Sequence, residues 1–238
     1  MRTITAVLAL VMWTTGAVLD GLSSSGAAQR EVLQRAPERP DGSRRYLFYL
    51  HGRLVEDHGP DAVSPDYGPY EYSAIIRQLS AEGFTVISGI RPPKTDPQIY
   101  SEGVADQIGH LIAAGVAPSH ITVVGASKGS VIAMLVSSRL TSAVRYVLLA
   151  NCNDYVLKAF SLSLHGDVLS IYEDSDDLGR TCVPLFDQSP DLGRRQEVRL
   201  TTGLRHGFIF RPLADWLRPA VAWARTGALP IEPHAQRR

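Results

Sequence analysis

The sequence has no excess of charge of either sign. Its 238 residues include 24 Lys and Arg against 24 Asp and Glu, so its formal net charge is zero. A nucleic-acid-binding protein usually needs a basic excess that neutralises phosphates, and binding to an anionic membrane surface needs a basic stripe. The sequence has neither, so we expect no nucleic-acid partner.

Sequence signals of cofactor binding are missing as well. No set of His, Cys, Asp and Glu residues has the spacing of a metal site, and no glycine-rich nucleotide fingerprint occurs. We find no internal repeat and no low-complexity segment. We therefore expect no metal, no cofactor and one domain, which a chain of this length can build around a continuous core.

The apolar run near the N-terminus is short. It covers residues 4–19, whereas a membrane-spanning helix needs roughly 20 apolar residues. Arg2 precedes the run and small residues follow it, which is the order of a signal peptide. We predict a signal peptide over residues 1–28 and an exported protein, periplasmic or secreted, whose mature form has no stable membrane span. An uncleaved anchor is the alternative.

The remaining chain alternates between short β-rich runs and helical patterns. Strands are predicted at residues 46–50, 84–88, 121–124, 144–149, 168–172 and 197–201. Helices are predicted at residues 70–81, 98–114, 127–140, 155–164 and 216–224. Strands separated by helices predict a three-layer α/β/α sandwich with a mostly parallel sheet. We assign this domain to residues 31–226 and a polar tail to residues 227–238.

A Gly-x-Ser-x-Gly motif joins the third predicted strand to an unusually apolar helix. It consists of Gly125, Ser127, Gly129 and the residues between them. A sharp strand-to-helix turn pushes the serine hydroxyl into the open, and glycine is needed where a side chain would collide with the neighbouring elements. This context indicates that Ser127 is a nucleophile; a tight turn with a capping serine is the structural alternative.

A serine hydroxyl needs a base near neutral pH, and His206 is the best candidate. It follows the last predicted strand, so its loop should lie beside the motif. The acid that orients the imidazole should come from the loop after the fifth strand. We favour Asp176 there, with Asp174 as second and Asp177 as third choice.

Two backbone N–H groups are candidates for an oxyanion hole. The first strand ends in His51-Gly52-Arg53, where the glycine permits a close approach of the backbone, so the N–H of Arg53 is one donor. The N–H of Lys128, directly after the nucleophile, is the other. We expect His51 to have a structural role and residues 54–72 to form a long loop.

Cysteine is scarce, with one residue after the fourth strand and one after the fifth. Cys152 and Cys182 would lie on the same rim of the sheet, and an oxidising compartment permits a disulfide between them. We favour a bridge that holds the loop after the fifth strand, which we call the acid loop; two buried thiols are the alternative.

Together these features resemble the α/β-hydrolase superfamily over nearly all of residues 45–225. The resemblance implies the α/β-hydrolase fold and a catalytic triad of Ser127, Asp176 and His206, which stand in the chain order of that superfamily. Small members without a cap domain are typically esterases, lipases or thioesterases. The sequence departs from the lipase and esterase branch because it lacks a His-Gly-Gly-Gly run, so the substrates of that branch do not carry over.

The leading hypothesis for function is a serine hydrolase that acts on a small-molecule acyl substrate, a carboxylic ester first of all, through an acyl-enzyme. Thioesterase, acyltransferase or peptidase activity on the same scaffold is an alternative. A non-catalytic α/β-hydrolase-like binding protein is another. The sequence does not indicate an oligomeric state.

Overall fold

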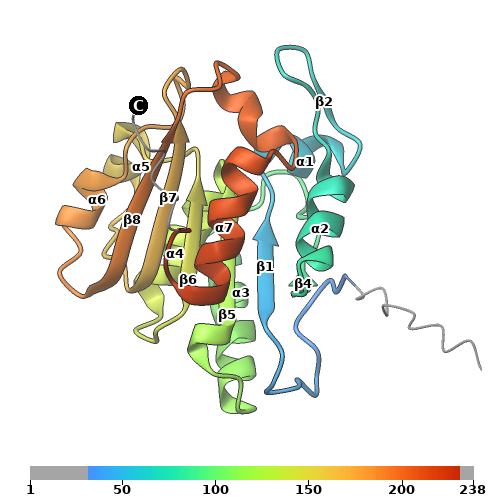
Figure 1. Cartoon of the computed structure of the whole chain (residues 1–238), viewed down its shortest axis with the longest axis vertical. Coiled ribbons are helices and arrows are strands. Elements are labelled where there is room, and N and C mark those ends of the chain that lie inside the picture. Colours follow the sequence, from blue (N-terminus) through green and yellow to red (C-terminus); the bar gives the residue numbers. More distant parts are fainter. Residues whose placement is uncertain (1–31, 231–238) are drawn as a thin grey trace, which may run out of the picture.

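Six parallel strands form the centre of the computed structural model, which describes residues 32–230 (Figure 1). The strands are β1 (Tyr46–Leu50), β4 (Thr85–Ile87), β5 (Ile121–Ala126), β6 (Arg145–Leu149), β7 (Gly166–Glu173) and β8 (Leu192–Leu200). Their order across the sheet is β4-β1-β5-β6-β7-β8. Every strand predicted from the sequence is present, and the predicted three-layer α/β/α sandwich is confirmed.

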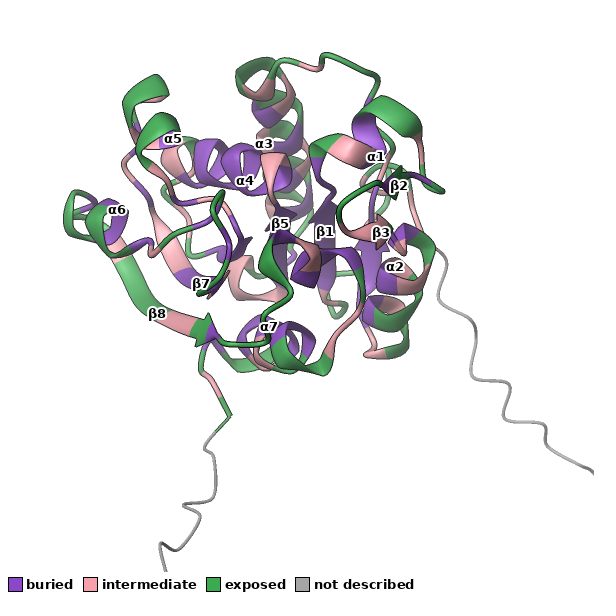
Figure 2. Cartoon of the chain, turned by 90° about the horizontal axis from the view of Figure 1, so that it is seen from above, coloured by how far each residue is buried: buried purple, intermediate pink, exposed green. Residues whose placement is uncertain are grey.

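Helices cover both faces of this sheet. They are α1 (Arg53–His58), α2 (Tyr72–Ala81), α3 (Pro97–Ala113), α4 (Lys128–Arg139), α5 (Asp154–Ala159), α6 (Val183–Asp187) and α7 (Ala214–Thr226). Figure 2 shows α3, α4 and α5 on one side of the strands and α2 and α7 on the other. The two layers bury separate hydrophobic cores, because successive side chains of a strand point to opposite faces. In β1, Phe48 belongs to the core under α3 and α4, whereas Leu47 and Tyr49 belong to the core under α2 and α7.

The order of the strands places a functional site at one point of the sheet. The chain adds β4 on one side of β1 and then crosses to add β5 on the other side. In open parallel sheets, ligands bind outside the carboxyl ends of the strands where the winding reverses in this way. The carboxyl ends of β1 and β5 are therefore the place to look for functional side chains.

The segment between β1 and α2 is more ordered than the sequence suggested. We expected a long loop at residues 54–72, but the structure contains α1 and a small hairpin of β2 (Val63–Ser64) and β3 (Gly68–Pro69). The six residues of α1 are too few to show helical periodicity in the sequence. The helix ends at Gly59, which has a φ of 84°, a conformation that glycine adopts at little cost.

Elements near the β8 edge of the sheet also differ from the prediction. The helix expected at residues 155–164 is shortened to α5, because the backbone of Phe160 is extended. Strand β8 begins at Leu192 rather than at residue 197, and α6 was not predicted. Because β8 is an edge strand and most of its first half is exposed, it lacks the apolar signal of the central strands (Figure 2).

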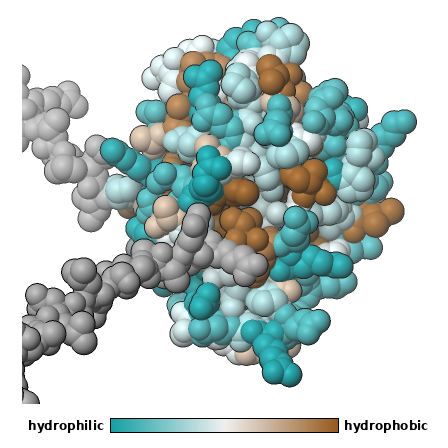
Figure 3. All heavy atoms as spheres, turned by 90° about the vertical axis from the view of Figure 1, so that its right-hand side faces the viewer, coloured by the Kyte–Doolittle hydropathy of each residue, from teal (hydrophilic) through white to brown (hydrophobic). Residues whose placement is uncertain are grey.

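The termini are only partly covered by the structure. The predicted signal peptide at residues 1–28 lies outside the described residues, as do residues 231–238 of the predicted tail. Over residues 32–230, no helix is both long and apolar enough to cross a lipid bilayer. Figure 3 views the side that carries α1 and α2, where several hydrophobic patches lie among hydrophilic side chains.

Candidate active site

Ser127 lies in a strained turn between β5 and α4. Its backbone has φ 52° and ψ −118°, a conformation that residues other than glycine rarely adopt. The two motif glycines leave room for this turn. A Cβ on Gly129 would lie 1.8 Å from the carbonyl oxygen of Leu50 in β1, and one on Gly125 would lie 2.4 Å from the carbonyl oxygen of Gly129. Neither position can hold a side chain, so the spacing of the motif follows from backbone crowding.

The structure brings Ser127, His206 and Asp176 together in one chain of hydrogen bonds. Ser127 Oγ lies 2.9 Å from His206 Nε2, and His206 Nδ1 lies 2.8 Å from Asp176 Oδ2. His206 and Asp176 are buried, with exposed fractions of 6% and 1%. When Nδ1–H donates to the carboxylate, Nε2 is left free to accept the proton of the serine hydroxyl. This is the arrangement required to activate a serine nucleophile.

The other acidic side chains of the loop have different partners. Asp174 is half-exposed and pairs with Arg199 at 2.6 Å, and Asp177 is exposed and pairs with Arg205 at 3.3 Å. Only Asp176 among these three aspartates faces the imidazole. Its second oxygen, Oδ1, accepts the backbone N–H of Leu178 at 2.9 Å, which fixes the direction of the carboxylate.

Glu173, the last residue of β7, connects the start of the acid loop to the segment that leads to His206. Its Oε2 accepts hydrogen bonds from both the backbone N–H and the hydroxyl of Thr202, and its Oε1 accepts the N–H of Gly203. Burial alone would raise the pKa of Glu173, but the hydrogen bonds from Thr202 and Gly203 outweigh it and hold that pKa below its ordinary value. The glutamate therefore stays ionised. The sequence gave no sign of this role.

The two candidate oxyanion donors lie at the starts of two helices. Arg53 is the first residue of α1 and Lys128 is the first residue of α4. The first N–H groups of a helix have no acceptor within the helix, so they are available to a ligand. A Cβ on Gly52 would lie 3.5 Å from the Cβ of Ser127, which shows how closely the β1 turn approaches the serine. The side chain of Arg53 is exposed and pairs with Asp57 at 3.4 Å, away from this role.

His51 is a buried, neutral part of the same turn. Its Nδ1 lies 2.9 Å from the carbonyl oxygen of Gly52, and its Nε2 accepts the backbone N–H of Arg91 at 3.1 Å. Burial and the nearby charge of Arg91 lower the pKa of His51 to about 4. The imidazole therefore holds two backbone segments together and does not exchange protons near neutral pH.

The depressed pKa of His51 predicts a loss of stability in acid. The unfolded chain binds a proton at His51 below pH 6.5, whereas the folded chain does so only near pH 4, so the free energy of unfolding falls as the pH drops through this window. The full loss from this residue is about 3 kcal/mol. Urea unfolding between pH 7 and pH 4 measures it.

His51→Gln is the test variant and His58→Gln, at an exposed position of α1, is its control. The first should flatten the dependence on pH, and the second should leave it unchanged. A wild-type slope in His51→Gln would contradict the assignment. Loss from Glu56, whose carboxyl pKa is lowered, sets in only as the pH falls below about its ordinary value of 4.5 and is thus separable.

A pocket opens beside His206. It has a volume of about 310 Å³, and it lies between the loop that carries Tyr67 and the segment around His206. Its lining residues are Asp66, Tyr67, Gly203, Leu204, Arg205, Gly207 and Arg211. The ring centroids of Tyr67 and His206 are 6.2 Å apart. Tyr70, from the same segment as Tyr67, is buried and hydrogen-bonded to Tyr49 at 2.7 Å.

Three charged side chains form a cluster that the sequence gave no reason to expect. Glu56 of α1 contacts both Arg91, from the loop after β4, and Lys128 of α4. The side chains of Glu56 and Arg91 are fully buried. The ion pairs join residues that are far apart in the sequence, so no local pattern reveals them.

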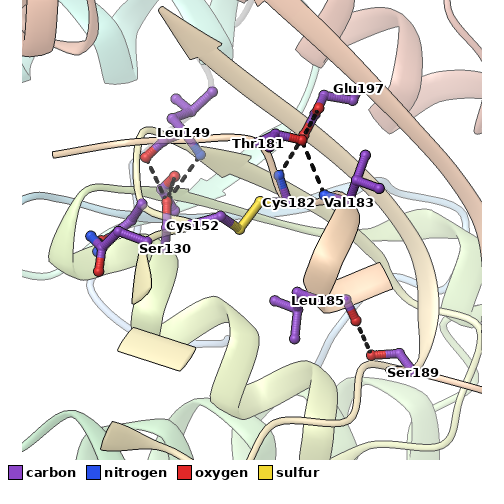
Figure 4. Close-up of a disulfide and its surroundings, with 12 residues drawn as sticks. Ser130, Leu149, Cys152, Thr181, Cys182, Val183, Leu185, Ser189 and Glu197 are labelled. Carbon is purple, nitrogen blue, oxygen red and sulfur yellow. Dashed lines mark hydrogen bonds between the residues drawn. A yellow bond between two sulfur atoms is a disulfide. The ribbon is translucent and has the colours of Figure 1, made fainter. Parts of the chain in front are cut away.

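A disulfide joins Cys152 to Cys182, as the sequence suggested (Figure 4). It connects the segment after β6 to the residue that precedes α6, and the acid loop lies between the two cysteines in the chain. Glu197 of β8 accepts the N–H of Cys182 at 2.6 Å and the hydroxyl of Thr181 at 2.6 Å. The bridge and these bonds hold the loop that carries Asp176 against the sheet. Within residues 32–230, no group of three or more His, Cys, Asp and Glu side chains is arranged to hold a metal ion.

Comparison with solved structures shows which fold this is. The chain is similar to the a/b serine hydrolase without lid XC6422 from Xanthomonas campestris (TM-score 0.51, 16% identity, 84% of this chain and 89% of that one). It is also similar to an esterase from Pyrobaculum calidifontis (0.52, 20%, 81% and 80%) and to SOBER1 from Arabidopsis thaliana (0.50, 12%, 77% and 98%). No family model and no curated protein sequence matches the chain. At these identities the likeness shows the fold of the chain and nothing about its substrate.

Proposed function

We propose that this chain, which has the α/β-hydrolase fold, is a serine hydrolase that cleaves an ester-like acyl bond. The observation that carries the proposal is the relay from Ser127 through His206 to Asp176, with hydrogen bonds of 2.9 Å and 2.8 Å at a strained strand-to-helix turn. A fold alone does not establish a reaction, so the proposal depends on this geometry.

Acylation begins when Ser127 Oγ attacks the acyl carbonyl carbon while His206 Nε2 accepts the hydroxyl proton. Asp176 stabilises the imidazolium that forms and holds it in the required orientation. The backbone N–H groups of Arg53 and Lys128 donate to the oxygen that becomes negative. When the bond to the leaving group breaks, the imidazolium gives its proton to that group, and the acyl chain stays on Ser127.

Deacylation repeats the same steps with water. His206 Nε2 takes a proton from a water molecule, which attacks the acyl carbonyl. The bond between the carbonyl carbon and Ser127 Oγ then breaks, the serine oxygen regains the proton from His206, and the free acid leaves. No group other than water is consumed, so the residues of the relay suffice.

The substrate we propose is a small molecule with a carboxylic ester bond. The segment between β6 and β7 holds only α5, which is six residues long, so no cap domain is inserted there. The Xanthomonas neighbour is likewise described as a serine hydrolase without lid, and the Pyrobaculum neighbour as an esterase. The pocket beside His206 is a place for part of this substrate. Export of the protein is supported by the disulfide, since such bonds persist in oxidising compartments.

A fluorophosphonate probe tests the proposal directly. Such probes phosphonylate an activated serine, so we expect one adduct, located at Ser127 by mass spectrometry of the digested protein. The variant His206→Ala should lose the label, because no base then accepts the hydroxyl proton. A folded protein that stays unlabelled would instead support a non-catalytic binding protein. A chain-length series of p-nitrophenyl esters, with a matched thioester series, then identifies the preferred acyl bond.

A further inference from the structure

The relay leaves the buried cluster of Glu56, Arg91 and Lys128 without a role. The exposed fractions of Glu56 and Arg91 are 2% and 1%. Burying ions is costly, and an ion pair of this kind is often no more stabilising than well-packed apolar side chains. A buried cluster next to the proposed oxyanion donors is therefore better explained by what it positions than by what it adds to stability.

Each oxygen of the Glu56 carboxylate has its own cation. Lys128 Nζ donates to Oε1 at 2.5 Å, and Arg91 Nε donates to Oε2 at 3.0 Å. Lys128 Nζ also donates to the carbonyl oxygen of Thr95 at 2.6 Å, and the backbone N–H of Thr95 donates to Oε1 at 3.2 Å. Arg91 donates further to the carbonyl oxygen of His51. Burial alone would raise the pKa of Glu56, but the bonds to Lys128 and Arg91 outweigh it and keep the carboxyl ionised.

The contact between Glu56 and Lys128 joins the first turns of two helices. Glu56 lies one turn after Arg53, at the start of α1, and Lys128 is the first residue of α4. Arg53 and Lys128 are the two residues whose backbone N–H groups we assign to the oxyanion hole. Arg91 extends the contact to His51, just before the β1 turn. The cluster thus connects both helix starts that carry the proposed oxyanion donors to one carboxylate.

We infer that Glu56 is a positioning residue that fixes the N–H groups of Arg53 and Lys128 at the separation and direction an oxyanion requires. The inference rests on the proposed function. Donors of this kind are effective only if they are held in place before the reaction, because the free energy needed to reorient them would offset the stabilisation that they give the transition state. Packing alone holds a helix, but directional bonds from both carboxylate oxygens also fix its rotation.

The sign of the cluster also suits a developing negative charge. Glu56 carries one negative charge, while Arg91 and Lys128 carry one positive charge each, so one positive charge remains. His51 adds none at neutral pH, since its pKa is about 4. Glu56→Gln would raise this net charge to two, which by itself favours an oxyanion, so a loss of kcat in that variant reports lost positioning of the donors and not lost positive charge.

Glu56→Gln is the decisive variant. It keeps the shape of the side chain but removes the charge, and its amide nitrogen must face one of the two cations. Losing an oxyanion donor lowers kcat by about 10²- to 10³-fold, so loosening both donors should lower kcat by about 10- to 100-fold. KM should change by less than about threefold, because the ground-state contacts remain. Burst titration with a p-nitrophenyl ester gives kcat per competent site.

The control is Glu102→Gln in α3, which removes another ion pair made with α4, the helix of Lys128. Glu102 pairs with Arg139 at the far end of α4, and both side chains are partly exposed. This variant should keep the wild-type kcat. Lys128→Met tests the cluster from its other side and, as Lys128 is partly exposed, also serves if Glu56→Gln does not fold. Combined with Glu56→Gln, it should cost no more than the worse single change.

The outcomes separate the inference from the proposed function. A purely structural role would reduce the number of competent sites while each remaining site kept the wild-type kcat, and that result in Glu56→Gln, or in Lys128→Met, would overturn the inference. An equal loss in Glu102→Gln would overturn it too. A wild-type protein with neither a burst nor a phosphonate label would instead remove the proposed function.

Discussion

Replacing Ser127 with alanine is expected to lower kcat by about 10⁴-fold or more, because the change removes the hydroxyl that His206 is placed to activate. The residual rate would come from the oxyanion donors and from substrate binding. Initial rates on a p-nitrophenyl ester measure the loss. The change deletes a single hydroxyl whose hydrogen bond is made to His206, so the fold should survive.

Two further measurements give this expectation its control. The urea midpoint of Ser127→Ala should match that of the wild-type protein. Adding His206→Ala should cause little further loss of kcat, since the two residues act as a unit. Turnover that persists in Ser127→Ala at more than about a hundredth of the wild-type rate would mean that another group is the nucleophile.

Asp176→Asn is expected to lower kcat by about 10⁴-fold through the wrong tautomer of His206. The structure explains why the amide cannot adapt. Oδ1 accepts the N–H of Leu178, so the amide oxygen of an asparagine must stay there and its NH₂ group must face His206 Nδ1. Nδ1 then becomes an acceptor and Nε2 carries the proton, which prevents it from accepting the proton of Ser127.

The neighbouring aspartates supply matched controls for that variant. Asp174→Asn and Asp177→Asn remove carboxylates of the same loop whose partners are Arg199 and Arg205. Both pairs are exposed, and exposed ion pairs contribute little, so kcat should stay within about threefold of wild type. A loss confined to Asp174→Asn would transfer the role of the acid to that residue. Kinetics on one ester substrate, at one pH, compare the three variants.

The residues of the relay were predictable because the sheet dictates where they meet. A parallel sheet collects the segments that follow its strands at one edge, so the order of strands in the sequence already places Ser127, Asp176 and His206 near one another. The motif around Ser127 is visible in the sequence because both of its glycines are required: a side chain on Gly125 would collide with Gly129, and one on Gly129 would collide with Leu50 of the neighbouring strand β1. Sequence reasoning works where the constraint is local or where the topology alone determines the neighbourhood.

Glu56 and Arg91 were unpredictable for the opposite reason. Their contact spans 35 positions and depends on how a short helix packs against the loop after β4, which leaves no periodic signal. The same holds for Glu173, whose bonds to Thr202 span 29 positions. The four acids within residues 173–177 look interchangeable in the sequence, and only their partners in space distinguish them.

The strained backbone of Ser127 lowers the stability of the fold at the position that the proposed reaction requires. A residue other than glycine held at φ 52° and ψ −118° costs the fold about 1–3 kcal/mol, and glycine would escape that cost. Selection for survival at high temperature, without selection for a reaction, would therefore favour the loss of the one hydroxyl in the relay. A protein that keeps serine at position 127 is therefore less stable than the same protein with glycine there, and only selection for the reaction would maintain the serine.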